Sequence, residues 1–103
     1  GNEIEVSDYT QALEDMYTAY NGQLSKAANL KSIVWISKAL EKEMDASTHT
    51  RLLIMLAQCF RDTDNGEKAK QCLNQAFVTS AGIEDPMEKE HIQGIIKQNL
   101  QGL

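Results

Sequence analysis

The apolar residues of the chain recur with the period of an α-helix, and no segment alternates as a β-strand does. From about residue 7 to 21, apolar side chains follow the i, i+3, i+4, i+7 spacing that gathers them on one helix face. These positions are Leu13, Met16, Tyr17 and Tyr20. The same spacing predicts four more helices, over about 25–44, 47–61, 67–80 and 86–100.

Local signals at several helix ends support these boundaries. Ser47 is the predicted N-cap of the third helix, because its hydroxyl can accept from an amide of the first turn. Residues 62–66 have the Asp, Asn and Gly composition of a turn. Asp85, Pro86 and Glu88 form an N-cap, a first helical position and a capping box for the last helix.

Each of the four later helices has an apolar stripe that we expect to face the core. The stripes are Ile33, Ile36, Ala39 and Leu40; Leu53, Leu56, Ala57 and Phe60; Ala69, Leu73, Ala76 and Phe77; and Ile92, Ile95, Ile96 and Leu100. The stripe of the first helix recurs forty residues later in the third, and again thirty-nine residues further on in the last. Amphipathic helices resemble one another in any case, so a generic helical bundle is the alternative to a repeat.

The repeat predicts an all-α fold in which stacked antiparallel helix pairs form a single domain over residues 1–103. The pairs cover about 7–44 and 47–80, and a capping helix covers about 86–100. This gives five helices, with the last one closing the stack.

Residues 53–81 resemble a tetratricopeptide repeat. The large and small apolar positions of that family's pattern are occupied by Leu53, Leu56, Ala57, Phe60, Ala69, Leu73 and Ala76. Ala81 stands where proline is usual, and the other two segments depart from the pattern, with Tyr17 and Ile96 at a position that is normally small. The resemblance implies a concave surface, lined by the first helix of each pair, that binds a peptide or a helix of another protein.

The surface that this resemblance implies contains four residues of the third helix and four of the first. They are Arg51, Ile54, Gln58 and Arg61, and Gln11, Glu14, Thr18 and Asn21. The two arginines suit bidentate binding of partner carboxylates, while the alternative is that all eight are ordinary solvated positions. The basic and amide residues with which the family's chaperone-tail binders hold a terminal carboxylate are not reproduced, because Ile54 and Met55 occupy the middle of this helix.

Composition narrows the classes of partner. A formal net charge of -5 disfavours nucleic acid and anionic membranes, which attract basic surfaces. The longest apolar stretch, residues 52–57, is too short to cross a bilayer, and no signal peptide is recognisable, so a cytoplasmic location is favoured. The chain begins with Gly rather than Met, which suggests a processed terminus or an excised domain.

The residue types that enzymes use are few and poorly spaced. His49 and Cys59 lie ten residues apart, about 15 Å along one helix, and only tertiary packing can bring Cys72 to His91. We expect no enzyme activity, no metal and no cofactor. A protein-binding module, as an adaptor, assembly factor or chaperone, is therefore the leading prediction. A structural or homo-oligomerising domain, or a fragment of a longer repeat array, is the alternative.

Overall fold

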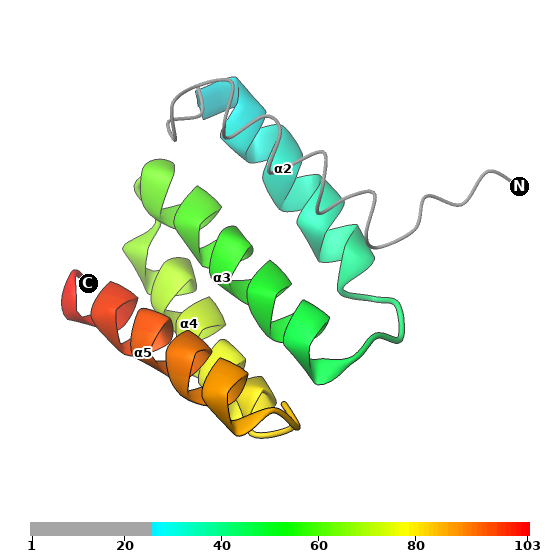
Figure 1. The fold of residues 1–103 in the computed structure, drawn as a ribbon. Coiled ribbons are helices and arrows are strands. Elements are labelled where there is room, and N and C mark those ends of the chain that lie inside the picture. The colour runs from blue at the N-terminus through cyan, green and yellow to red at the C-terminus, as the bar shows by residue number, and fades with distance from the viewer. Residues whose placement is uncertain (1–25) are drawn as a thin grey trace, which may run out of the picture.

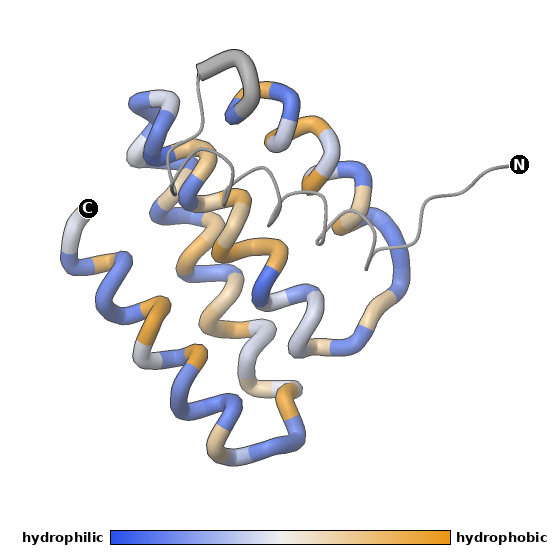
Figure 2. Tube along the Cα trace, turned by 45° about the horizontal axis from the view of Figure 1, so that its top comes forward, coloured by the Kyte–Doolittle hydropathy of each residue, from blue (hydrophilic) through white to orange (hydrophobic). Residues whose placement is uncertain are grey.

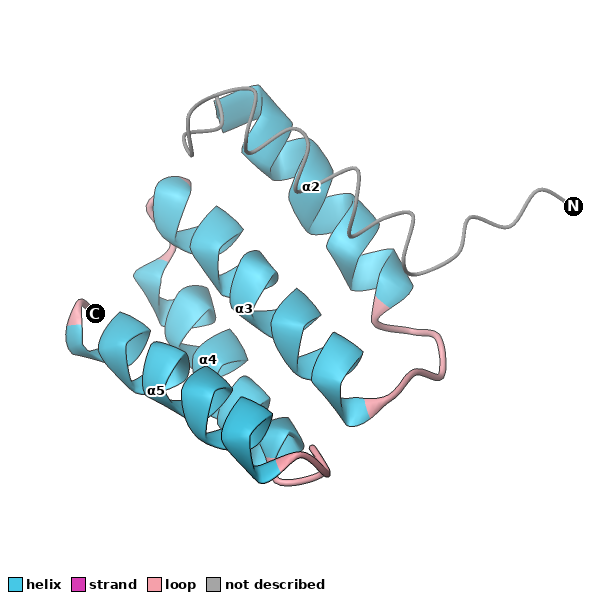
Figure 3. Ribbon diagram, in the orientation of Figure 1, coloured by secondary structure: helices cyan, strands magenta, loops and turns pink. Residues whose placement is uncertain are grey.

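The computed structural model describes residues 26–103, which form four α-helices joined by short loops (Figures 1 and 3). The helices are α2 (Lys26–Ala39), α3 (Ala46–Asp62), α4 (Gly66–Ser80) and α5 (Pro86–Gln101). This part of the chain contains no strand, which confirms the predicted all-α class. The predicted total of five helices is not matched, because the helix expected over residues 7–21 lies outside the described residues.

Consecutive helices run in opposite directions, and each packs against the helix before it (Figure 1). The helix α3 therefore packs against both α2 and α4, and α4 packs against both α3 and α5. As a result α3 and α5 run in the same direction, and side chains of α3 reach both ends of α5. This parallel pair is the part of the fold that positions the candidate site.

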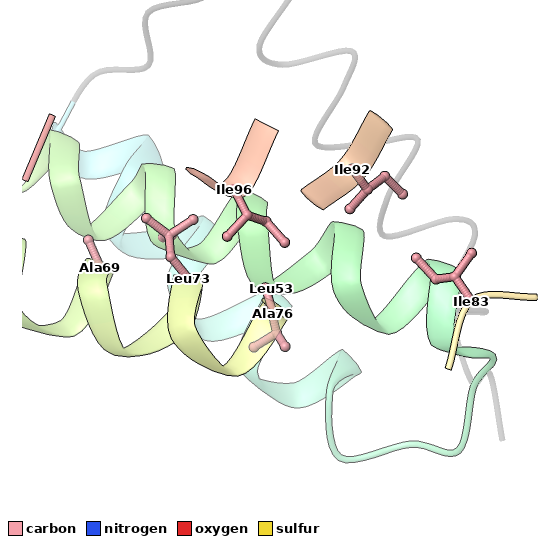
Figure 4. Close-up of a cluster of buried hydrophobic side chains, with 8 residues drawn as sticks. Leu53, Ala69, Leu73, Ala76, Ile83, Ile92 and Ile96 are labelled. Carbon is pink, nitrogen blue, oxygen red and sulfur yellow. The ribbon is translucent and has the colours of Figure 1, made fainter. Parts of the chain in front are cut away.

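The apolar side chains form two buried clusters, and the hydrophobic positions turn mainly toward neighbouring helices (Figure 2). The α3–α4–α5 cluster, shown in Figure 4, consists of Leu53, Ala57, Ala69, Leu73, Ala76, Ile83, Ile92 and Ile96. The α2–α3 cluster consists of Ile36, Ala39, Leu52, Leu56 and Cys59. Leu40, Phe60 and Cys72 pack against both clusters and so connect them.

Three alanines lie in the contact between α3 and α4. Ala57 is 3% exposed, and Ala69 and Ala76 are completely buried. Small side chains at these positions let the helix backbones approach, and Leu53 and Leu73 fill the space beside them. The alanine positions that the sequence pattern assigned to the helix contact are therefore confirmed as buried.

The structure corrects the predicted start of α3. Asp45, and not Ser47, is the N-cap: its backbone is extended, and its carboxylate accepts from the Thr48 amide at 3.1 Å and the Thr48 hydroxyl at 2.7 Å. The hydroxyl bond of Thr48, followed by its amide bond, lowers the pKa of Asp45 below its usual value. Both residues are good caps, so local sequence alone did not separate them.

The second helix ends at Ala39, five residues before the predicted end at Met44. The Glu41 and Lys42 amides donate to the Lys38 and Ala39 carbonyls, which tightens the chain into a turn. This turn brings Met44 back to pack against the α2–α3 cluster. The local composition favours a helix that continues to Met44, but the chain turns after Ala39 and Met44 packs against the core instead.

The turn between α3 and α4 depends on Asp64 and not on Gly66, two residues further along the chain. Asp64 has a φ of 61°, whereas Gly66 is already the first residue of α4. The Asn65 amide donates to the Phe60 carbonyl at 2.8 Å and the Asp64 amide donates to the Arg61 carbonyl at 3.2 Å. This is a Schellman motif, and it ends α3 by satisfying its last carbonyls.

At the start of α5, Asp85 and Pro86 hold the predicted positions. The Asp85 carboxylate accepts from the Met87 amide at 3.0 Å, and Pro86 is the first helical residue. The predicted capping box is wrong, because the Glu88 carboxylate accepts instead from Ser47 and Arg51 of α3. A tertiary contact therefore replaces the local one.

Two of the predicted stripes also need correction. Phe77 was expected in the core, but it is 38% exposed, and the Lys97 ammonium lies over its ring at 5.8 Å from the centroid. Leu52 and Cys59, outside the predicted stripe of α3, are buried. The helix α3 is covered on two sides, so its apolar surface is wider than one stripe.

We predict that Asp64→Gly raises the free energy of unfolding by about 0.5–1 kcal/mol. Glycine removes the steric cost of a positive φ, although it also makes the unfolded chain more flexible. Urea denaturation followed by circular dichroism measures the change. Asp62→Gly is the matched control: it removes the same charge two residues earlier, at the last residue of α3, and is expected to lower stability. A loss of stability in Asp64→Gly contradicts this account of the turn.

Candidate functional site

The four predicted residues of α3 share one face of that helix, and the structure turns part of this face toward α5. Arg51 and Arg61 are exposed, while Ile54 and Gln58 are half-buried. Ile54 packs against the α3–α4–α5 cluster, so its side chain belongs partly to the core. The face therefore has one apolar and one amide side chain, Ile54 and Gln58, at its centre and a long cationic side chain toward each end.

Arg51 contacts the first turn of α5. Its Nη2 lies 3.3 Å from Glu88 Oε1, and its Nε donates to Ser47 Oγ at 3.4 Å. Ser47 Oγ in turn donates to the same Glu88 oxygen. The Arg51 side chain is 56% exposed and that of Glu88 is 29% exposed, so solvent screens the pair and its contribution to stability is about 1 kcal/mol or less. Arg51 is therefore already paired with a carboxylate of the same chain, although the pair stabilises the fold only weakly.

Arg61 contacts the last turn of α5. Its Nη1 donates to Asn99 Oδ1 at 3.5 Å, and its Nη2 lies so close to Gly102 that a Cβ built there would be 2.7 Å away. A cation at this end of a helix interacts favourably with the free carbonyl groups. Asn99 is neutral, however, so the contact of Arg61 differs in kind from that of Arg51.

Of the remaining predicted binding residues, only Gln58 lies within the described part of the chain, and it bonds within its own helix. The Gln58 amide donates to Asp62 Oδ1 at 3.2 Å, one turn along the same helix. The first-helix residues Gln11, Glu14, Thr18 and Asn21 lie outside the described residues. The structure thus brings the four α3 residues together, and the predicted contribution of the first helix stays a prediction.

Sequence reasoning missed the α5 side of this site. Glu88, Asn99 and Gly102 contact the two arginines, and none of them was a candidate binding residue. One signal was present: the eleven-residue separation of Glu88 and Asn99 nearly equals the ten-residue separation of Arg51 and Arg61. Matched spacings of this kind become informative only once α3 and α5 are known to run parallel.

The two thiols do not have the properties of nucleophiles. Burial raises the pKa of Cys59 from 9.0 to about 11, and the negative charge of Asp62 adds to the rise. Burial also raises the pKa of Cys72, against a smaller opposing effect of Lys68. Both cysteines are free thiols. Thiolates are scarce at neutral pH as a result.

Within residues 26–103, no group of three or more His, Cys, Asp or Glu side chains is arranged to hold a metal ion. Among the described helices, none has the length and apolar character needed to span a membrane. Comparison of the chain with known protein families, with curated proteins and with solved structures gave no match.

We predict that Cys59 of the native protein reacts with iodoacetamide about 100-fold more slowly at pH 8 than the unfolded chain does, because a pKa of about 11 instead of 9.0 lowers the thiolate fraction by that factor. Cys72, which is less buried, should react first. Since the folded state favours the protonated Cys59, this contribution to stability is present below pH 9 and is lost as the pH rises toward about 11.

Peptide mass spectrometry after timed alkylation resolves the two cysteines. Native Cys59 that reacts as fast as the unfolded chain would show that its burial and raised pKa are misassigned. Alkylation in urea is the control for the intrinsic reactivity of each thiol.

Proposed function

We propose that this protein is a binding module for another protein, and that the surface formed by α3 and α5 holds a peptide or helix of the partner. The observation that carries the proposal is the row of Arg51, Ile54, Gln58 and Arg61 beside a parallel helix. Its arginines are ten residues apart, about 15 Å along α3, which matches the length of a short bound segment.

The proposal includes a tetratricopeptide-like arrangement of the helices. In it, α2 is the second helix of a first pair, α3 and α4 are the second pair, and α5 closes the stack. The buried alanines between α3 and α4 and the antiparallel order of the helices support this arrangement. The arginine row then lies on the first helix of its pair, where such folds place their binding residues.

The exposed side of α5 supports its role as a closing helix. Glu90, His91 and Gln98 are exposed there together with Gly94 and one apolar residue, Met87, which is 81% exposed, while Ile92 and Ile96 are buried against α3 and α4. A mainly polar outer face is what a terminal helix of a stack needs for solubility. Self-association through the apolar stripe of α5, one form of the alternative function, would require that stripe to leave the core.

The alternative of an oligomerising domain retains one specific observation in its favour. Leu30 and Val34 lie one turn apart on α2 and are 51% and 50% exposed. Two apolar side chains of this size on one helix face are a candidate self-contact. The second candidate function is therefore self-association through α2.

The test is selection of peptides from an unbiased display library on the full chain, with its mass in solution measured by light scattering. We predict a monomer whose selected peptides bind at least about tenfold more weakly to the Arg51→Glu, Arg61→Glu double variant, because glutamates replace both cations of this surface. The matched control is Lys31→Glu, Lys38→Glu, which makes the same charge change at exposed positions of α2 and should bind as the wild type.

Peptides that bind the arginine variant and the wild type equally would contradict the proposed surface. A chain that selects no peptides, and whose mass rises with concentration unless Leu30 and Val34 are replaced by glutamate, would establish the oligomerising function instead.

A further inference from the structure

We infer that the bound partner is an acidic protein segment, and that Arg61, rather than Arg51, binds its side-chain carboxylate. This inference rests on the proposed function, because it names the chemistry that the same surface recognises. It depends on a difference between two arginines that the sequence presents as equivalent.

The two arginines differ in the charge of the side chain that each one contacts within the chain. Arg51 already has a carboxylate partner, since Glu88 Oε1 lies 3.3 Å from its Nη2. Arg61 donates to the amide oxygen of Asn99 at 3.5 Å, which is at the outer limit of hydrogen-bond geometry. A bidentate bond to a carboxylate adds a second hydrogen bond and the attraction of opposite charges, both of which the single long bond to a neutral amide lacks. A partner carboxylate therefore gains more at Arg61.

The Arg61 guanidinium lies against the C-terminal end of α5. It lies between the last turn of α3 and the last turn of α5, against Asn99 and against Gly102, where no side chain intervenes. A guanidinium has five N–H donors in a rigid planar fork, and one contact to Asn99 leaves most of them available to solvent or a partner. Because the side chain already rests on α5, less conformational entropy is lost when a ligand binds.

The charged residues are unevenly divided between residues 1–25 and the described helices. The net charge of -5 comes from residues 1–25, which contain five of the fifteen acidic residues and none of the ten Lys and Arg residues. Residues 26–103 hold ten acidic and ten basic residues and are neutral as a unit. The carboxylate that follows Arg61 in the chain, Asp62, accepts from Gln58. Residues 26–103 thus add no net negative charge to that of residues 1–25, and the attraction that an acidic segment meets is local to Arg61.

The experiment gives Arg61 the internal partner that Arg51 already has. Asn99→Asp places a carboxylate where the neutral amide now accepts from Arg61, so it competes with the partner for Arg61, and it also removes the hydrogen bond that the Asn99 amide donates to the Ile95 carbonyl at 2.8 Å. The matched control is Gln98→Asp, which adds the same charge one residue away at an exposed position of α5. Circular dichroism and urea denaturation of both variants establish that each remains folded.

Peptides selected from the unbiased library on the full wild-type chain are synthesised with amidated C-termini. Each is made as selected and with every Asp and Glu replaced by Asn and Gln. The inference predicts that the selected set is enriched in Asp and Glu. It also predicts that affinity, measured by fluorescence polarisation, falls about tenfold with the neutral peptides or with Asn99→Asp, and less than about twofold with Gln98→Asp.

Equal binding of the acidic peptides to wild type and Asn99→Asp would overturn the assignment to Arg61, as would equal binding of the neutral peptides. Binding that is lost on amidation alone would assign the site to a terminal carboxylate and also overturn it. These outcomes differ from failure of the proposed function, in which no peptide is selected or the selected peptides bind the Arg51→Glu, Arg61→Glu variant as well as the wild type.

Discussion

The contact between α3 and α4 is the interaction on which the rest of the described fold depends. Ala57, Ala69 and Ala76 are almost fully buried in the cluster that these two helices share, and side chains this small allow close packing of the backbones. Phe60 and Cys72 pack against both apolar clusters, so the contact is joined to α2 as well as to α5. Larger side chains at the alanine positions would separate the helices that support both clusters.

This packing also decides where the candidate site lies. Because successive helices alternate in direction, α5 runs parallel to α3 and matches it in length, with contacts at both of its ends. The result is two arginines in similar positions with different partners, Glu88 for Arg51 and Asn99 for Arg61. The difference in charge between those two partners comes from α5, although the arginines themselves belong to α3.

The sequence predicted the last three helices to within one residue at each end, because apolar periodicity and turn residues act locally. It failed where two local choices were similar, as at Asp45 and Ser47, or where a distant contact prevailed, as at Glu88. Helical spacing alone predicted that the four α3 residues share one face, and the tetratricopeptide resemblance made that face the candidate site. Its contacts with Asn99 and Glu88 were not, because they depend on the length of α4 and on the loop that follows it.

The most direct test of the dependence on α3 and α4 is the stability of Ala76→Leu, a change at a fully buried position. We predict that the added side chain lowers the free energy of unfolding, measured by urea denaturation, by about 1–3 kcal/mol and speeds hydrogen exchange of the α5 amides. Gln75→Leu, at the neighbouring exposed position, should change stability by about 0.5 kcal/mol or less. An Ala76→Leu variant as stable as the wild type, with unchanged exchange in α5, would contradict this account.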